Sequence, residues 1–345
     1  MDLLTITEHT AKTGDHRTFY LAAGPETGPL LIFVHGWPEL SLSWRHQLPI
    51  FGAMGFRAIA PDLRGYGRST VYSRHEDYAQ ERIVGDMIGL LDHLGAERAV
   101  FIGHDWGSPV VWNVASHHPE RCHGVVSLCV PYYTLERGLE PALDLVDRSI
   151  YPEEDFPAGQ WDYQLYYQEN FDGARRFFEA NPYNTVKLLL RRGDPAQKGQ
   201  PTFTAAVRKE GGWFEGAAEA PDMPRDDAVL TEADLRSYAE ALSRNGFFGP
   251  DSYYMNHAAN AEYAAKAANG GVLQMPVLFI SAEYDYVCEC NDSRFADPMR
   301  EYCKDLTFHT LQSGHWVAQE KPRELNAALS GWLATKVPGV WPREL

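Results

Sequence analysis

The stretch Gly103-His104-Asp105-Trp106-Gly107 governs the interpretation of the whole chain. It follows an apolar run at residues 99–102 and precedes a helical pattern that Pro119 ends. A strand, a sharp turn and a helix in this order are typical of the nucleophile elbow G-x-S-x-G, here with aspartate in place of serine. The flanking glycines permit close approach and strained backbone angles. The alternative is that Asp105 only caps the helix.

An aspartate nucleophile points to a particular kind of substrate. A carboxylate can attack an electrophilic sp³ carbon, and the product is an ester that water can cleave at its carbonyl. Epoxides and haloalkanes offer such carbons. We therefore expect an enzyme of one of these two classes if the elbow interpretation holds.

The pattern of apolar runs predicts an α/β fold with a helical insertion. Short apolar runs without alternation are typical of buried parallel strands, and helical patterns separate them. Residues 132–264, which are rich in aromatic and acidic residues and in proline and glycine, contain no strong strand pattern. We predict a first core part at 1–131, a helical cap domain at 132–264 and a second core part at 265–345. The expected strands are 30–34, 58–60, 99–102, 125–130, 276–281 and 306–311, and the expected helices are 77–94, 106–117, 163–170, 232–245 and 323–334.

Composition narrows the partners and the compartment. The 31 basic and 47 acidic residues give a formal charge of −16 without a basic cluster, which argues against nucleic acid and anionic membranes as partners. No signal-peptide pattern or apolar stretch of about 18 residues is present, so we expect a cytoplasmic protein. The five cysteines are typical of reduced thiols rather than disulfides. A metal site at Cys288-Glu289-Cys290 is disfavoured.

Two later strands each run into a candidate partner for Asp105. The strand at 276–281 leads to Asp285, with Glu283 as the competing acid, at the carboxyl end where open α/β sheets place their sites. The strand at 306–311 leads to His315, which we expect to be the general base rather than one more surface histidine. The order nucleophile, acid, histidine is that of hydrolases with this elbow.

A third element follows the strand at 30–34, where the chain reads HGWPE at 35–39. In such folds a backbone N–H of this loop joins the N–H of the residue after the nucleophile to form an oxyanion hole. We therefore predict that Trp37 and Trp106 are the donors. A tight turn with Trp37 packed in the core is the simpler alternative, and both can hold because the donor is backbone.

Over nearly its whole length the chain resembles the α/β-hydrolase epoxide hydrolases of the soluble microbial, plant and mammalian type. The motifs that carry the resemblance are HGWPE (35–39), APDLRGYGRS (60–69), GHDWGS (103–108), DYQLYYQE (162–169), GFFGPDSYY (246–254), AEYD (282–285) and GHW (314–316). In this family two cap tyrosines hydrogen-bond the epoxide oxygen. The matching positions are Tyr163, with Tyr166 and Tyr167 as competitors, and Tyr254.

The second tyrosine motif departs from the family pattern. Family members typically read N-W-Y-R where this chain has Ser252-Tyr253-Tyr254-Met255, so Tyr253 is the fallback for Tyr254. The resemblance implies a small apolar epoxide as substrate and no cofactor or metal, and a homodimer is the assembly that we consider. The predicted substrate-binding residues are Trp37, Trp106, Phe171 and Tyr253.

Three alternatives share the fold. Haloalkane dehalogenases carry the same Asp-Trp-Gly-Ser string, but they generally read His-Gly-Asn where this chain has Trp37, and halide release has no use for paired cap tyrosines. Fluoroacetate dehalogenases typically have an arginine at the position of Trp106. A non-catalytic binding protein of this fold would have lost its triad, whereas this chain retains every predicted group.

Overall fold

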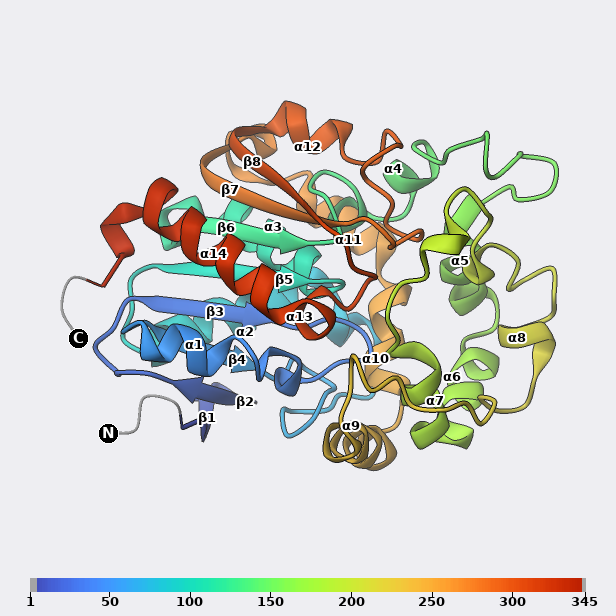
Figure 1. Ribbon diagram of the computed structural model, residues 1–345, viewed down its shortest axis with the longest axis horizontal. Helices are drawn as coiled ribbons and strands as arrows, with labels where there is room; N and C mark the ends of the chain where they lie inside the picture. The colour runs from blue at the N-terminus through green and yellow to red at the C-terminus, as the bar shows by residue number, and fades with distance from the viewer. Residues whose placement is uncertain (1–4, 343–345) are drawn as a thin grey trace.

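The structure, a computed structural model, describes residues 5–342, and in this range eight strands form one sheet in the order β1-β2-β4-β3-β5-β6-β7-β8. The pairs from β4 to β8 are parallel, whereas β1 and β2 add an antiparallel edge. The predicted α/β class is therefore confirmed (Figure 1). The strands are β1 (Thr7–Thr13), β2 (His16–Ala23), β3 (Leu30–Val34), β4 (Arg57–Pro61), β5 (Ala99–His104), β6 (Cys122–Leu128), β7 (Leu273–Ala282) and β8 (Cys303–Leu311).

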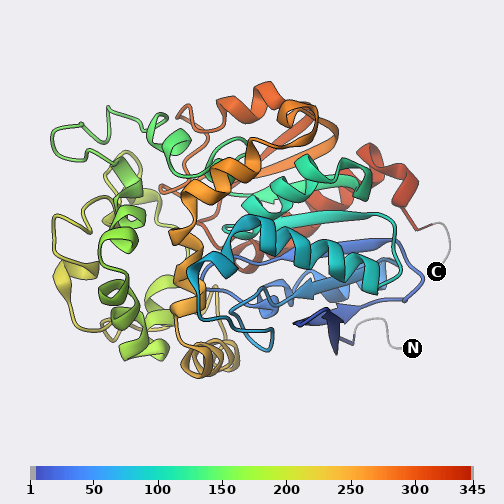
Figure 2. The same ribbon diagram turned by 180° about the vertical axis from the view of Figure 1, so that it is seen from behind.

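Helices cover both faces of this sheet. In Figure 1 helices α1 and α14 lie in front of the strands, and in Figure 2, which shows the opposite side, α2 and α3 lie in front. The central strands are accordingly buried along their length, as their continuous apolar sequences predict. The core helices are α1 (Leu48–Ala53), α2 (Gln80–His93), α3 (Gly107–His117), α11 (His257–Ala264), α12 (Asp297–Tyr302), α13 (Val317–Glu320) and α14 (Pro322–Lys336).

A group of helices between β6 and β7 lies beyond one end of the sheet, on the right in Figure 1. These helices are α4 (Glu140–Leu143), α5 (Asp162–Glu169), α6 (Phe171–Ala180), α7 (Pro182–Leu189), α8 (Trp213–Gly216), α9 (Glu232–Asn245) and α10 (Phe248–Ser252). Helix α11 then returns to the core and contacts α2. We call the segment from α4 to the 3-10 turn that follows α10, η8 (Tyr253–Met255), the cap. No helix within residues 5–342 combines the length and apolarity that a membrane span requires.

The structure adds elements that the apolar pattern does not predict. β1 is largely exposed, so polar residues occupy most of its positions and the strand has no apolar signature. The predicted helix 77–94 is divided into a 3-10 turn, η2 (His75–Tyr78), and α2. The division of the chain at 131 and 264 stays a prediction, and residues 1–4 and 343–345 of the predicted core parts lie outside the described residues.

Candidate active site

Asp105 lies on a sharp turn between β5 and α3. Its φ of 49° is in the left-handed region, which a non-glycine residue adopts only where the surroundings enforce it. A Cβ at Gly103 would lie 2.4 Å from the Gly107 carbonyl oxygen, and one at Gly107 would lie 2.2 Å from the Val34 oxygen. Both flanking positions therefore require glycine, and the turn presents the Asp105 carboxylate at the end of the sheet.

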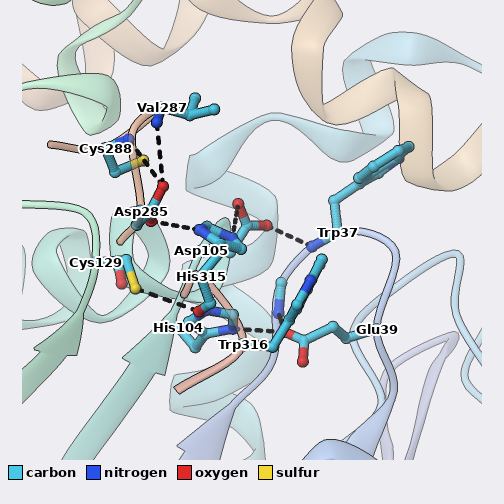
Figure 3. Close-up of polar contacts among 12 residues, drawn as sticks. Trp37, Glu39, His104, Asp105, Cys129, Asp285, Val287, Cys288, His315 and Trp316 are labelled. Atoms are coloured by element: carbon cyan, nitrogen blue, oxygen red, sulfur yellow. Dashed lines mark hydrogen bonds and ion pairs between the residues drawn. The ribbon is translucent and has the colours of Figure 1, made fainter. Parts of the chain in front are cut away.

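The structure brings Asp105, Asp285 and His315 together (Figure 3). His315 Nε2 lies 3.3 Å from Asp105 Oδ2, and His315 Nδ1 lies 2.6 Å from Asp285 Oδ2. The other Asp285 oxygen accepts hydrogen bonds from the amides of Val287 and Cys288 at 3.2 and 3.1 Å. Asp285 is thus held by its own loop, and it orients the imidazole toward Asp105. The competing acid, Glu283, does not line the cavity at this site.

The charges of these groups shift one another's proton affinity. Burial by itself would lower the pKa of His315, but the carboxylates of Asp285 and Asp105 raise it well above its usual value. Burial by itself would raise the pKa of Asp285, but His315 and the backbone amide of Cys288 hold it below its usual value. The site therefore favours an imidazolium between two carboxylates while Asp105 is ionised.

The loop after β3 supplies an amide at the expected place. The Trp37 backbone N–H donates to Asp105 Oδ1 at 2.6 Å. A Cβ on Gly36 would lie 2.3 Å from Asp105 Oδ1 and 2.7 Å from the Trp106 nitrogen, so only glycine lets this loop approach the elbow. Of the two predicted donors, the Trp37 amide binds the Asp105 carboxylate, and the Trp106 amide lies where the Gly36 loop approaches the elbow.

A buried ion pair supports the loop of His315 from below. His104 Nδ1 lies 2.7 Å from Glu39 Oε2, and His104 Nε2 lies 2.7 Å from the His315 carbonyl oxygen. Burial by itself would lower the pKa of His104, but the adjacent Glu39 carboxylate raises it to about 10. Burial opposes ionisation of Glu39 as well, yet His104 lowers its pKa to about 2. Both groups are therefore charged at neutral pH, and His104 can donate to His315 and Glu39 together.

A cavity of about 160 Å³ lies above Asp105, between the sheet and the cap. Its wall is mostly apolar and aromatic, with a few polar groups at the Asp105 end, as small-molecule sites usually are. The lining residues are Trp37, Asp105, Trp106, Pro109, Val130, Leu135, Tyr163, Gln164, Leu189, Phe203, Thr204, Trp213, Tyr254, Asp285, Val287, Cys288, His315 and Trp316.

Two tyrosines of the cap reach this cavity, and they are those named from the sequence. Tyr163 lies on α5 and Tyr254 on the 3-10 turn η8 (Tyr253–Met255), with ring centroids 5.6 Å apart. Gln164 Nε2 donates to the Tyr163 oxygen at 3.1 Å, which leaves the phenolic hydrogen free to donate elsewhere. Burial raises the pKa of both phenols, so they stay protonated and can act as donors.

Two of the predicted substrate-binding residues, Phe171 and Tyr253, do not line the cavity. Phe171 is not part of the cavity wall and packs against His75 and Phe248. Tyr253 points the other way from Tyr254, and its hydroxyl donates to the Arg64 carbonyl oxygen at 3.1 Å. Side chains that are adjacent on a tight helical turn face different directions, and the sequence does not say which of the two faces the cavity.

The competitors of Tyr163 on α5 also lie away from the cavity. Tyr166 accepts a hydrogen bond from Asn170, and Tyr167 stacks on the far side of Tyr254 with centroids 4.4 Å apart. Tyr163 alone among the three tyrosines of this helix lines the cavity.

Sequence reasoning missed a contact between core and cap. The indole Nε1 of Trp37 donates to Asp251 Oδ1 on α10 at 2.9 Å, and the Asp251 side chain is fully buried. Burial raises the pKa of Asp251 well above its usual range, although the hydrogen bond from Trp37 opposes this shift. Trp213 on α8 is a further wall residue that the sequence did not indicate. Asp251 belongs to the motif GFFGPDSYY (246–254), but neither that motif nor any periodicity indicates that Trp37 is its partner.

The comparisons with known proteins agree with this geometry. A family profile for the alpha/beta hydrolase fold matches residues 29–322. Epoxide hydrolase A of Mycobacterium tuberculosis is 34% identical over 332 residues, which are 95% of this chain and 97% of that protein. The chain belongs to the epoxide hydrolases of the α/β-hydrolase fold. The crystal structure of Epoxide Hydrolase A from Mycobacterium thermoresistibile superposes on this chain with a TM-score of 0.77 at 34% sequence identity. The superposition covers 96% of this chain and 99% of the chain in the crystal structure.

The mammalian relatives are longer. Bifunctional epoxide hydrolase 2 of Sus scrofa is 35% identical over 311 residues, which are 90% of this chain but 52% of that protein. The chain thus spans about half the length of the bifunctional relatives that it matches.

Proposed function

We propose that this epoxide hydrolase family member converts an apolar epoxide and water to a vicinal diol through an ester on Asp105. One observation carries the proposal. Asp105, which is paired with His315, and two protonated tyrosines line the same small aromatic cavity. Nucleophile and oxygen donors lie on opposite walls, so an epoxide between them has its carbon toward Asp105 and its oxygen toward Tyr163 and Tyr254.

The first step opens the ring. An Asp105 oxygen attacks a ring carbon, the carbon–oxygen bond breaks, and its electron pair passes to the epoxide oxygen. Tyr163 and Tyr254 hydrogen-bond this oxygen, and one of them transfers its proton to it. The raised pKa of the phenols keeps this proton in place until the oxygen becomes basic enough to take it.

The second step cleaves the ester. Esterification removes the charge of Asp105, so the pKa of His315 falls and the imidazolium releases its proton to the solvent, from which it takes one back when Asp105 is ionised again. The neutral imidazole is then a base that takes a proton from water. The resulting hydroxide attacks the ester carbonyl carbon, and the amides of Trp37 and Trp106 stabilise the oxyanion. When the intermediate collapses, His315 returns its proton to the departing diol oxygen. Asp105 leaves this step as the free acid, whose proton restores the tyrosine.

The proposal predicts where the oxygen of water goes. In a single turnover in oxygen-18 water with protein in excess over styrene oxide, the label should enter the peptide that contains Asp105, and the diol should stay unlabelled. Steady-state diol formation from styrene oxide, trans-stilbene oxide and a long-chain epoxide would show the substrate size that the cavity accepts. Asp105→Ala is the control and should form no diol.

Failure of these tests would point to the other class. If folded protein forms no diol from any epoxide but releases halide from a haloalkane, the dehalogenase alternative replaces the proposal. Label in the diol rather than in Asp105 would argue for direct attack of water on the epoxide and against the ester.

Location and assembly are parts of the same proposal. All five cysteines are free, buried thiols, which suits a reducing compartment such as the cytoplasm. The net charge of −16 argues for a small-molecule substrate and against nucleic acid or anionic membranes as partners. For the assembly we retain a homodimer, which sedimentation of the purified protein would test.

A further inference from the structure

A cysteine lies at the centre of the candidate active site and has no role in the proposed reaction. Cys288 lines the cavity together with Asp285 and His315. One ligand atom from each of these three residues lies within 4.8 Å of the other two. The loop after β7 fixes this arrangement, because the amide of Cys288 donates to Asp285 Oδ1 at 3.1 Å. Figure 3 shows Cys288 next to Asp285.

Thiolate, imidazole and carboxylate are the three ligand types that Zn²⁺ takes in proteins. With metal–ligand distances of about 2.0 to 2.3 Å, neighbouring ligand atoms of a tetrahedral site are about 3.5 Å apart. The three atoms in this structure lie within 4.8 Å of one another, so side-chain rotations that bring them about 1 Å closer suffice. Three protein ligands at the edge of a cavity would leave the fourth position to water.

A second possible group is less suitable. The ligand atoms of His104, Cys129 and His315 also lie within 4.8 Å of one another. However, His104 uses both ring nitrogens, one toward Glu39 and one toward the His315 carbonyl oxygen, and Cys129 Sγ lies 3.4 Å from the same carbonyl. Neither residue lines the cavity through which an ion would arrive.

The cysteine pair of the segment Cys288-Glu289-Cys290 is less suitable as well. Cys290 Sγ lies 3.0 Å from the Cys288 carbonyl oxygen and 3.6 Å from that of Cys129, and Cys290 does not line the cavity. Of the pair, only Cys288 is grouped with other ligands among the described residues.

We propose that Asp285, Cys288 and His315 form an inhibitory site for a soft divalent cation of the zinc and cadmium class. Binding replaces the thiol hydrogen of Cys288 with a metal–sulfur bond, and the proton passes to the solvent. The ion also takes an imidazole nitrogen of His315 and the Asp285 carboxylate that orients it. Metal binding and the hydrolysis of the Asp105 ester therefore exclude each other. This consequence for turnover rests on the proposed function, whereas the binding itself does not.

Cadmium tests the site because a cadmium–thiolate bond absorbs in the ultraviolet. We expect the full chain to develop this absorption with one Cd²⁺ per chain and to lose diol formation over the same concentrations, with recovery on chelation. In Cys288→Ala the absorption should vanish. The Cd²⁺ concentration that halves diol formation should rise at least on the order of tenfold, where each protein is compared with its own metal-free rate.

Two matched variants locate the effect. Cys303→Ala removes a buried thiol at the start of β8, and Cys290→Ala removes the other cysteine of the pair. Both should retain the absorption and the inhibition. Loss of both signals in Cys290→Ala would overturn the proposed ligand set in favour of the cysteine pair.

A further measurement does not need any variant to fold. Cd²⁺ should protect Cys288, and no other cysteine, from alkylation by N-ethylmaleimide, as read by peptide mass. The metal site would be overturned if Cd²⁺ neither raises the ultraviolet absorption of the wild-type protein nor protects Cys288 from alkylation. Continued diol formation by the same protein would then leave the proposed function intact. Absorption and protection without diol from any epoxide would instead contradict the proposed function and leave the metal site supported.

Discussion

The two walls of the cavity are held in different ways. On the sheet side, Asp105, Asp285 and His315 sit on short loops at strand ends, and backbone amides or charged neighbours bind each one. On the cap side, Tyr163 and Tyr254 are held mainly by ring packing against Trp213, Trp106 and one another. Hydrogen bonds select one residue at one place, whereas ring packing accepts several aromatic residues. This difference explains why the sequence motifs indicate single residues on the sheet side but several candidates on the cap side, where Phe171 and Tyr253 do not line the cavity.

The largest expected effect lies on the sheet side. His315→Gln removes the base of ester hydrolysis but leaves Asp105 able to open the ring, so turnover should fall by a factor on the order of 10⁴ or more. Intact-mass measurement should show protein carrying one substrate mass. In Tyr163→Phe this adduct should not build up, because that variant slows ester formation instead. If His315→Gln consumes substrate but its mass shows no adduct, the ester does not accumulate without the base. The two walls would then not serve different steps of the reaction.

On the cap side, each tyrosine hydroxyl should contribute less than the base does. Tyr163→Phe and Tyr254→Phe each lose one donor to the developing oxyanion, and the rate of ester formation should fall by a factor on the order of 10² to 10³. Stopped-flow single turnovers would measure it. Tyr253→Phe is the matched control, since its hydroxyl bonds the Arg64 carbonyl away from the cavity. An equal loss in this control would reverse the assignment of the two neighbours.

The hydrogen bond between Trp37 of the core and Asp251 of the cap can also be tested. Asp251→Ala leaves the buried Trp37 indole N–H without an acceptor, which should cost about 1 to 3 kcal/mol in the free energy of unfolding. Denaturant unfolding would measure the loss. Asp251→Asn keeps a side-chain oxygen that can accept the indole hydrogen bond, so it should retain most of the stability. If Asn and Ala destabilise equally, this bond does not hold core and cap together.

The last effect is a pH dependence of stability that comes from the ion pair of His104 and Glu39. The pKa of His104 rises from 6.5 to about 10 on folding, so its contribution is complete below pH 6.5 and is lost as pH rises through 10. The pKa of Glu39 falls from 4.5 to about 2, so its contribution is complete above pH 4.5 and is lost as pH falls through 2. The pair therefore stabilises most between pH 4.5 and 6.5.

Melting temperatures would measure this window. The difference between wild type and Glu39→Gln should be largest within it and should shrink steadily above pH 6.5. The exposed Glu97→Gln is the control and should show no such trend. A difference that stays constant up to pH 10 would mean that His104 is not held charged by Glu39.

The sequence by itself determined the parallel part of the sheet, the elbow and the order of Asp105, Asp285 and His315. Buried parallel strands carry continuous apolar runs, and their loops at one edge must place polar residues close together, so a one-dimensional pattern is sufficient. It also named Tyr163 and Tyr254, although only through resemblance to a family.

Only the tertiary structure decided which cap aromatics face the cavity, that Asp251 bonds Trp37, and that Cys288 rather than the pair with Cys290 joins other ligand groups. It also supplied the edge strand β1, whose exposed residues have no apolar pattern. In each case the outcome depends on contacts between segments far apart in the chain. Local periodicity and spacing carry no record of such contacts.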